Sequence, residues 1–171
     1  MAELISSSYS KETFPELFTF RFGMTKKEVK NLYKKRGLKP IFEGADRMDF
    51  IGPPIDLALS GETNLVFEKN LLAELSQYFV IEDDDPSAFK HISKYRDLKD
   101  QLRAKYGPPE SIEFMDDAYN NSNGRLEGFK TKKGNYASMW RDVEGMSIFL
   151  VLGGDHLDTF LRLTYKSKAD S

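Results

Sequence analysis

The stretch Phe20–Val29, FRFGMTKKEV, predicts a strand that ends at a glycine and passes directly into a helix. Phenylalanines at 18, 20 and 22 alternate with polar residues, and this period of two is typical of a half-buried strand. Thr25 and Glu28 then form a Thr-x-x-Glu capping box, in which each side chain accepts a hydrogen bond from a first-turn amide. Gly37 is a stop signal. We therefore expect a helix over residues 26–36.

The rest of the chain carries β signals and one further long helix. Alternation over 55–60 predicts a strand, and two apolar runs within 62–81 predict a hairpin about its central Lys-Asn pair. An Asp-Pro helix start and a Gly-Pro-Pro stop predict a second helix over 86–106. Two more hairpins are expected, joining RLEGFK (125–130) to NYASMW (135–140) and MSIFLVL (146–152) to DTFLRLTYK (158–166).

Both halves of the chain follow the same order of elements, a helix and then an antiparallel meander. Each helix needs a sheet face to cover its apolar stripe. We therefore predict an α+β fold, with two tandem helix-plus-antiparallel-sheet units forming one compact body. The first unit spans 1–82, including the N-terminal strand, and the second spans 83–171, and we expect one continuous domain.

Two segments, FGMTKKEVKNLYKKRG (22–37) and LVFEKNLLAELSQYF (65–79), resemble the repeating unit of the SmpA/BamE-like fold, which β-lactamase inhibitor proteins share. There a Gly-Met-Ser/Thr-x-x-Glu-Val helix precedes a small antiparallel sheet that ends in a hairpin. The resemblance is clearest over 22–79 and covers 91–165 only in the order of elements. It implies a tandem α+β scaffold that acts by protein–protein contact and not by catalysis.

Composition narrows the classes of function. The chain has 171 residues, a net charge of −2 and no cysteine, which excludes thiolate metal sites and cysteine nucleophiles. The chain departs from the SmpA/BamE lipoproteins, because no signal peptide and no cysteine for lipid attachment are visible, and this departure argues against an outer-membrane role. Neither a secretory signal nor an apolar run of membrane-spanning length is visible, so we expect a cytoplasmic protein without membrane insertion.

No motif indicates catalysis or a cofactor. His91 and His156 are the only histidines, and neither has the spacing of a metal ligand. Phosphate-binding, dinucleotide-binding and nucleophile-elbow motifs are missing from the sequence. The acidic run 82–85 is explained by helix capping. We expect no catalytic residue, metal or cofactor, and an enzyme that uses a carboxylate with His156 stays open as an alternative.

Another protein is therefore the expected partner. Trp, Tyr and Arg dominate protein-interface hot spots, and an uncovered sheet face would present such residues. The interface candidates are Trp140, Tyr136, Phe129 and Arg141, with core packing as the alternative for the rings.

Two other binding functions stay open. The first is a carrier that holds a small apolar ligand between sheet and helix. The second is an anion or nucleic-acid binder that uses the basic face of helix 26–36, represented by Lys30, Lys34 and Lys35. Nucleic acid is not the expected partner, because the chain is acidic overall and a solvated helix face explains the same lysines.

Overall fold

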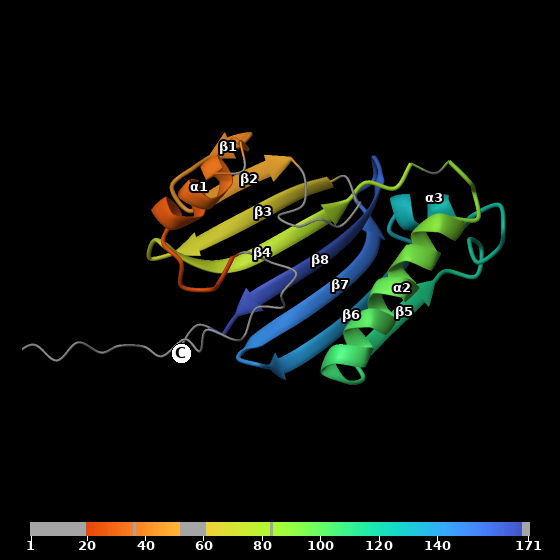
Figure 1. Cartoon of the computed structure of the whole chain (residues 1–171). Coiled ribbons are helices and arrows are strands. Elements are labelled where there is room, and N and C mark those ends of the chain that lie inside the picture. Colours follow the sequence, from red (N-terminus) through yellow and green to blue (C-terminus); the bar gives the residue numbers. More distant parts are fainter. Residues whose placement is uncertain (1–19, 36, 52–60, 83, 169–171) are drawn as a thin grey trace, which may run out of the picture.

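A computed structural model describes residues 20–35, 37–51, 61–82 and 84–168 (Figure 1). The elements in chain order are α1 (Lys26–Lys35), β1 (Phe42–Glu43), β2 (Arg47–Ile51), β3 (Gly61–Glu68), β4 (Leu71–Phe79), α2 (Phe89–Tyr106), β5 (Glu110–Met115), α3 (Arg125–Lys130), β6 (Gly134–Val143), β7 (Met146–Gly154) and β8 (Thr159–Ser167).

The strands form one eight-stranded sheet in the order β1-β2-β3-β4-β8-β7-β6-β5, with every neighbouring pair antiparallel. At its centre, residues 74–79 of β4 pair with 161–166 of β8. The prediction of two tandem helix-plus-sheet units is therefore wrong, because the last strand of each half pairs with the other and leaves no boundary between two sheets. The expected division after residue 82 falls in the connection from β4 to α2.

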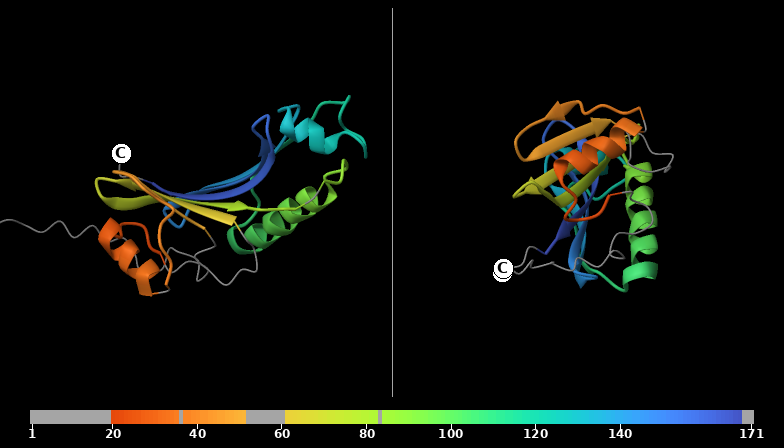
Figure 2. Two further views of the ribbon diagram at one scale, coloured as in Figure 1. Left: turned by 90° about the horizontal axis from the view of Figure 1, so that it is seen from above. Right: turned by 60° about the vertical axis from the view of Figure 1, so that its left-hand side comes forward.

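Both longer helices pack on the same face of this curved sheet (Figure 2). Val29 and Tyr33 are the buried residues of α1, and the Tyr33 ring lies between the rings of Phe20 and Phe50. Ile92, Tyr95, Leu98 and Leu102 form the buried stripe of α2, which lies over β6 and β7. The short helix α3 packs at one end of β5–β8. The apolar core therefore lies between the helices and one sheet face.

The first predicted helix is confirmed, and its cap has the expected geometry. The Thr25 amide donates to Glu28 Oε2 at 2.8 Å, and the Glu28 amide donates to Thr25 Oγ1 at 3.3 Å. The strand expected before it is wrong over 20–22, where the chain turns and meets the start of β4. There the Gly23 amide donates to the carbonyl of Leu72, whose own amide donates to the carbonyl of Met24. Residues 18–19 and the strand expected at 55–60 lie outside the described residues.

Two of the three predicted hairpins are confirmed, β3–β4 and β7–β8. In the first, Lys69 and Asn70 both have positive φ, at 51° and 66°, as a two-residue turn matched to the strand twist requires. The third hairpin is wrong, because 125–130 form α3. Leu126 and Phe129 are three residues apart and both buried, which suits a helical turn.

The second predicted helix is confirmed, but it begins at Phe89 and not at Pro86. Asp85 forms a turn before the helix and does not cap it: its Oδ1 accepts from the Ser87 amide at 3.0 Å and its Oδ2 from Ser87 Oγ at 2.6 Å. Ala88 then adopts a left-handed conformation with φ 53°. Strands β1, β2 and β5 were not predicted.

Candidate protein-binding face

The sheet face opposite α1 and α2, hereafter the open face, is the candidate functional site (Figure 2). Ser138 of β6 points toward α2, because its Oγ lies 2.7 Å from Tyr95 Oη. Side chains alternate along a strand, so Ala137 and Met139 lie on the open face. Residues directly opposite in neighbouring strands share a face, and the register therefore assigns open-face positions across the whole sheet.

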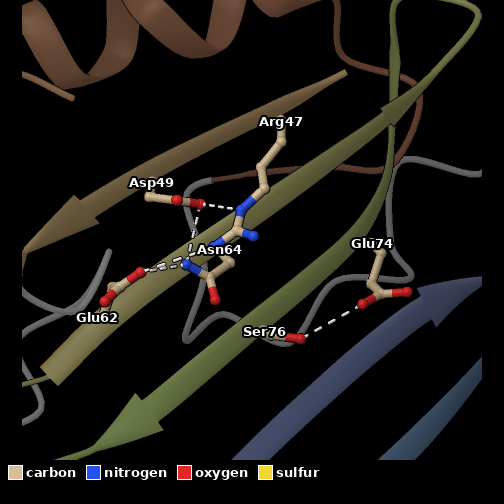
Figure 3. A network of polar contacts seen from close by, with 6 residues as sticks. All are labelled: Arg47, Asp49, Glu62, Asn64, Glu74 and Ser76. Atoms are coloured by element: carbon tan, nitrogen blue, oxygen red, sulfur yellow. Dashed lines mark hydrogen bonds and ion pairs between the residues drawn. The ribbon is translucent and has the colours of Figure 1, made fainter. Parts of the chain in front are cut away.

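A polar network occupies the open face on β2 and β3 (Figure 3). Asp49 is 5% exposed, and its Oδ1 accepts from Arg47 Nε at 2.6 Å and from Asn64 Nδ2 at 3.0 Å. Asn64 Nδ2 also donates to Glu62 Oε1 at 2.7 Å. The hydrogen bond to Asp49 raises the pKa of Arg47 further above its usual value. Every carboxylate of this network therefore has a partner within the sheet.

The centre of the open face joins the two halves of the chain. Ser76 Oγ on β4 lies 2.7 Å from Thr164 Oγ1 on β8, and both residues are buried. Next to them, Lys166 Nζ is 3.7 Å from Glu74 Oε2. These contacts fix the β4–β8 register from the side that the helices leave uncovered.

Arg162 lies in the same central region, opposite Tyr78 on β4 and Val151 on β7. Its Nη1 donates to Tyr78 Oη at 3.1 Å, and its Cζ lies 5.7 Å from the ring centroids of both Tyr78 and Phe160. The two rings are edge-on to each other with centroids 6.3 Å apart. Two aromatic rings and a phenol oxygen therefore hold one guanidinium in place.

The open face becomes apolar toward β5. Half-buried Phe149 and Val151 of β7 are followed by Met139 of β6 and then by Ile112 and Phe114 of β5, which are 72% and 54% exposed. Large exposed apolar side chains gathered on one face are typical of an interaction surface.

The structure places the predicted interface residues on two different faces. Trp140 is 2% exposed, and its Nε1 donates to the carbonyl of Gly107 at 2.8 Å, on the helix-covered side. Phe129 is fully buried in α3, and Tyr136 packs against it with ring centroids 5.2 Å apart. Arg141 alone of the four lies exposed on the open face, 3.6 Å from Glu110.

Burial also affects the chemistry of Tyr95 on the sheet-facing side of α2. It raises the pKa of Tyr95 to about 12, so the hydroxyl group stays protonated well into the alkaline range. Ser138 Oγ connects it to Ser111 Oγ, at 2.7 Å and 2.9 Å. This chain of hydroxyl groups runs from the buried Tyr95 and Ser138 to the exposed Ser111 on the helix-covered side and contributes nothing to the open face.

The basic candidates on α1 are not brought together as one free cluster. Lys30 Nζ is 2.9 Å from Glu43 Oε1, and Lys26 contacts the same carboxylate at 3.9 Å. Lys34 and Lys35 are exposed in the last turn of α1, where positive charge complements the helix dipole.

The histidines lie apart from each other and from the open face. His91 is buried on α2, and His156 is exposed in the β7–β8 turn. Within the residues that the structure describes, no group of three or more histidine or acidic side chains could hold a metal ion. None of the helices in those same ranges is both long and apolar enough to cross a bilayer.

The residues that sequence reasoning missed carry a signal that could have found them. On β8, Leu161, Leu163 and Tyr165 alternate with a second set, Phe160, Arg162, Thr164 and Lys166. The first set consists of large apolar or aromatic side chains that face the helices. The second set, which contains the polar residues, therefore marks the open face.

Neither a protein-family model, nor a curated protein, nor a solved structure matches this chain. The resemblance to the SmpA/BamE-like fold therefore stays an expectation from the sequence.

Proposed function

We propose that this protein is a non-enzymatic binding module and that another protein docks on its open face. The observation that carries the proposal is the packing of α1 and α2 on the same side of one continuous sheet. The other side keeps large apolar and aromatic side chains at its surface.

The open face is large enough for a specific interface. Strands lie about 4.8 Å apart and rise about 3.3 Å per residue, so five strands of 8–10 residues with the shorter β2 and β5 span on the order of 800–900 Å². A stable protein–protein interface uses roughly 800 Å² on each partner. One globular protein could therefore cover this face.

The distribution of side chains also favours a protein partner. The arginine held beside two rings lies near the centre, and aromatic and Arg side chains dominate interface hot spots. The apolar part on β5–β7 would be desolvated on docking, and the ion-paired charges on β2–β4 would form a polar rim.

The two alternatives receive less support. Two of the lysines on α1 are already engaged by Glu43, which leaves a weak site for an anion. Between helices and sheet, stacked rings such as Tyr33 with Phe50 fill the space in which an apolar ligand would lie. The cytoplasmic location expected from the sequence stays a prediction.

Site-specific photocrosslinking in the source cell tests the proposal. A photoreactive amino acid is placed at Met139 or Val151 on the open face and, as a matched control, at exposed Arg96 on α2. We expect the open-face positions to yield a crosslinked protein that an excess of wild-type chain displaces. The same protein, once purified, should bind the wild-type chain and bind a Val151→Lys variant roughly tenfold more weakly or worse.

Crosslinking of the same proteins with equal yield from Arg96 would contradict the proposal. So would unchanged binding by Val151→Lys. Circular dichroism and thermal unfolding of each variant separate loss of binding from loss of fold.

A further inference from the structure

Each cation of the open face has a carboxylate partner among the described residues, with the exception of Arg162. Lys166 pairs with Glu74 and Arg141 pairs with Glu110, at 3.7 Å and 3.6 Å. Arg47 pairs with Asp49 in the polar network. Among the described residues, no carboxylate lies within ion-pair distance of Arg162. The centre of the open face therefore presents one uncompensated positive charge.

The surroundings of this guanidinium preorganise it. Nη1 is engaged by Tyr78 Oη, and Nε is buried without a hydrogen-bond partner in the described part of the chain. Nη2 also makes no hydrogen bond there. A planar guanidinium held by rings loses little freedom when it binds, and low-dielectric neighbours strengthen its attraction for an anion.

The next strand supplies an apolar floor beside the charge. Val151 lies directly opposite Arg162 on β7, and Phe149 lies two residues away on the same face of that strand. A ligand that satisfies both features needs an anionic group next to apolar groups. Multiply charged phosphate is less suitable, because one free cation would face it, and Glu74 lies on the neighbouring strand β4 with Glu62 on β3 beyond it.

We propose that Arg162 anchors an acidic side chain of the protein partner, whose carboxylate accepts from Nη2 while its apolar neighbours cover Phe149 and Val151. The proposal rests on the proposed function and specifies the chemistry of the partner. Charge complementarity selects the occupant: an apolar segment that carries an Asp or Glu, and not a second copy of the same face, which would oppose Arg162 to Arg162 near a two-fold axis.

A randomised displayed peptide library, selected on the immobilised full chain, provides the probe. We expect the enriched peptides to contain Asp or Glu flanked by apolar residues. The best peptide and its twin, with that acid changed to Asn or Gln, are then titrated against the wild type, Arg162→Gln and Arg162→Lys. Arg96→Gln is the matched control, because it removes an exposed arginine from α2, away from the open face.

Arg162→Gln should weaken binding of the acidic peptide roughly tenfold or more. The neutral twin should bind the wild type and Arg162→Gln equally, because the two changes remove one shared interaction. Arg162→Lys should retain part of the affinity, and Arg96→Gln, which lies on α2 away from the open face, should change it less than about twofold.

The outcomes separate this inference from the proposed function. Enriched peptides without an acid, or acidic peptides insensitive to Arg162→Gln but lost on Val151→Lys, would overturn the role of Arg162 and leave the open face as the docking site. No enrichment, or binding insensitive to both substitutions, would overturn both.

Discussion

Gly153 and Gly154 are neighbours on β7, but they face opposite sides of the sheet and differ in the room available to a side chain. A Cβ on Gly154 would lie 2.2 Å from the carbonyl oxygen of Phe129 in α3, which is backbone and cannot move alone. A Cβ on Gly153 would lie 3.2 Å from Asn135 Oδ1 and 3.4 Å from the Phe160 ring, and both are side chains. The close approach of α3 to the sheet therefore depends on Gly154.

We expect Gly154→Ala to lower the free energy of unfolding by about 2–3 kcal/mol, because α3 must move away from β7. Gly153→Ala, the matched control, should cost less than about 1 kcal/mol. Urea unfolding of both variants checks the difference. Equal costs would show that α3 does not rest on β7 at this point.

At the residue scale, the sequence predicts which side chains share a strand face but not which face the helices cover. Alternation along β6 places Met139 and Arg141 on one face and Tyr136 and Trp140 on the other. Their burial depends on α2, which reaches β6 from a distant part of the chain. Local periodicity carries no information about that contact, so the rings were assigned to the interface when they belong to the core.

Among the elements, the β7–β8 turn has a stability that depends on pH. Asp155 Oδ1 accepts from the amides of Asp158 at 2.9 Å and Leu157 at 3.0 Å, and these hydrogen bonds lower the pKa of Asp155 below its usual 3.8. A carboxyl group with a lowered folded-state pKa stabilises the fold fully above its unfolded-state pKa. This stabilisation is lost as the pH falls through the folded-state pKa.

Asp155→Asn should therefore show a smaller fall in the free energy of unfolding than the wild type when the pH drops below about 4. Asn keeps an acceptor oxygen but does not titrate. Urea midpoints measured from neutral to acid pH give the comparison. Asp117→Asn is the control, since that exposed side chain makes no hydrogen bond in the described part of the chain, and an equal effect of the two variants would refute the assignment.

β5 is the longer of the two edge strands, and its open edge carries exposed apolar side chains. It has six residues, against two in β1, and Ile112 and Phe114 are 72% and 54% exposed. An edge of this kind can pair with another chain. A lysine on the edge hinders such pairing.

We expect Ile112→Lys to reduce concentration-dependent self-association, measured by sedimentation velocity, with little change in unfolding free energy. Leu157→Lys provides the control, because Leu157 is 88% exposed in a turn far from the edge. If Leu157→Lys reduced self-association as much, general charge and not the β5 edge would be responsible.

The helices and strands that the sequence predicts correctly are those marked by residues close to them in the chain. The capping box of α1 and the turns of two hairpins lie within a few residues of the structures that they start or join. Prediction from the sequence failed for β5 and α3, which have six residues each and give too few periods to distinguish strand from helix. Their conformations are decided by packing against β6 and the end of the sheet.

At the scale of the whole molecule, the β4–β8 pairing makes the sheet one structural unit. This pairing joins residues 74–79 to 161–166, which lie far apart in the sequence, so it has no local signal. Among the described residues, the central strands have neighbours on both sides, and the outer strands β1 and β5 have a neighbour on one side.

Native-state hydrogen exchange should therefore show the slowest exchange in β4 and β8 and the fastest in β1 and β5. Gly154→Ala should accelerate exchange in β3 and β4 as well as in β6–β8, although its clash lies in the second half of the chain. Loss of protection confined to β5–β8 would instead indicate two units that unfold separately.

The buried position of the single tryptophan also determines what optical experiments can report. Trp140 lies on the helix-covered side, and its indole N–H is bound to the carbonyl of Gly107 just after α2. Its emission should be blue-shifted, shielded from quenchers and sensitive to detachment of α2. A protein docking on the opposite face leaves this fluorophore in the same surroundings. The intrinsic fluorescence thus reports folding and does not change on binding. A dye attached to a Met139→Cys variant, on the open face, would report binding.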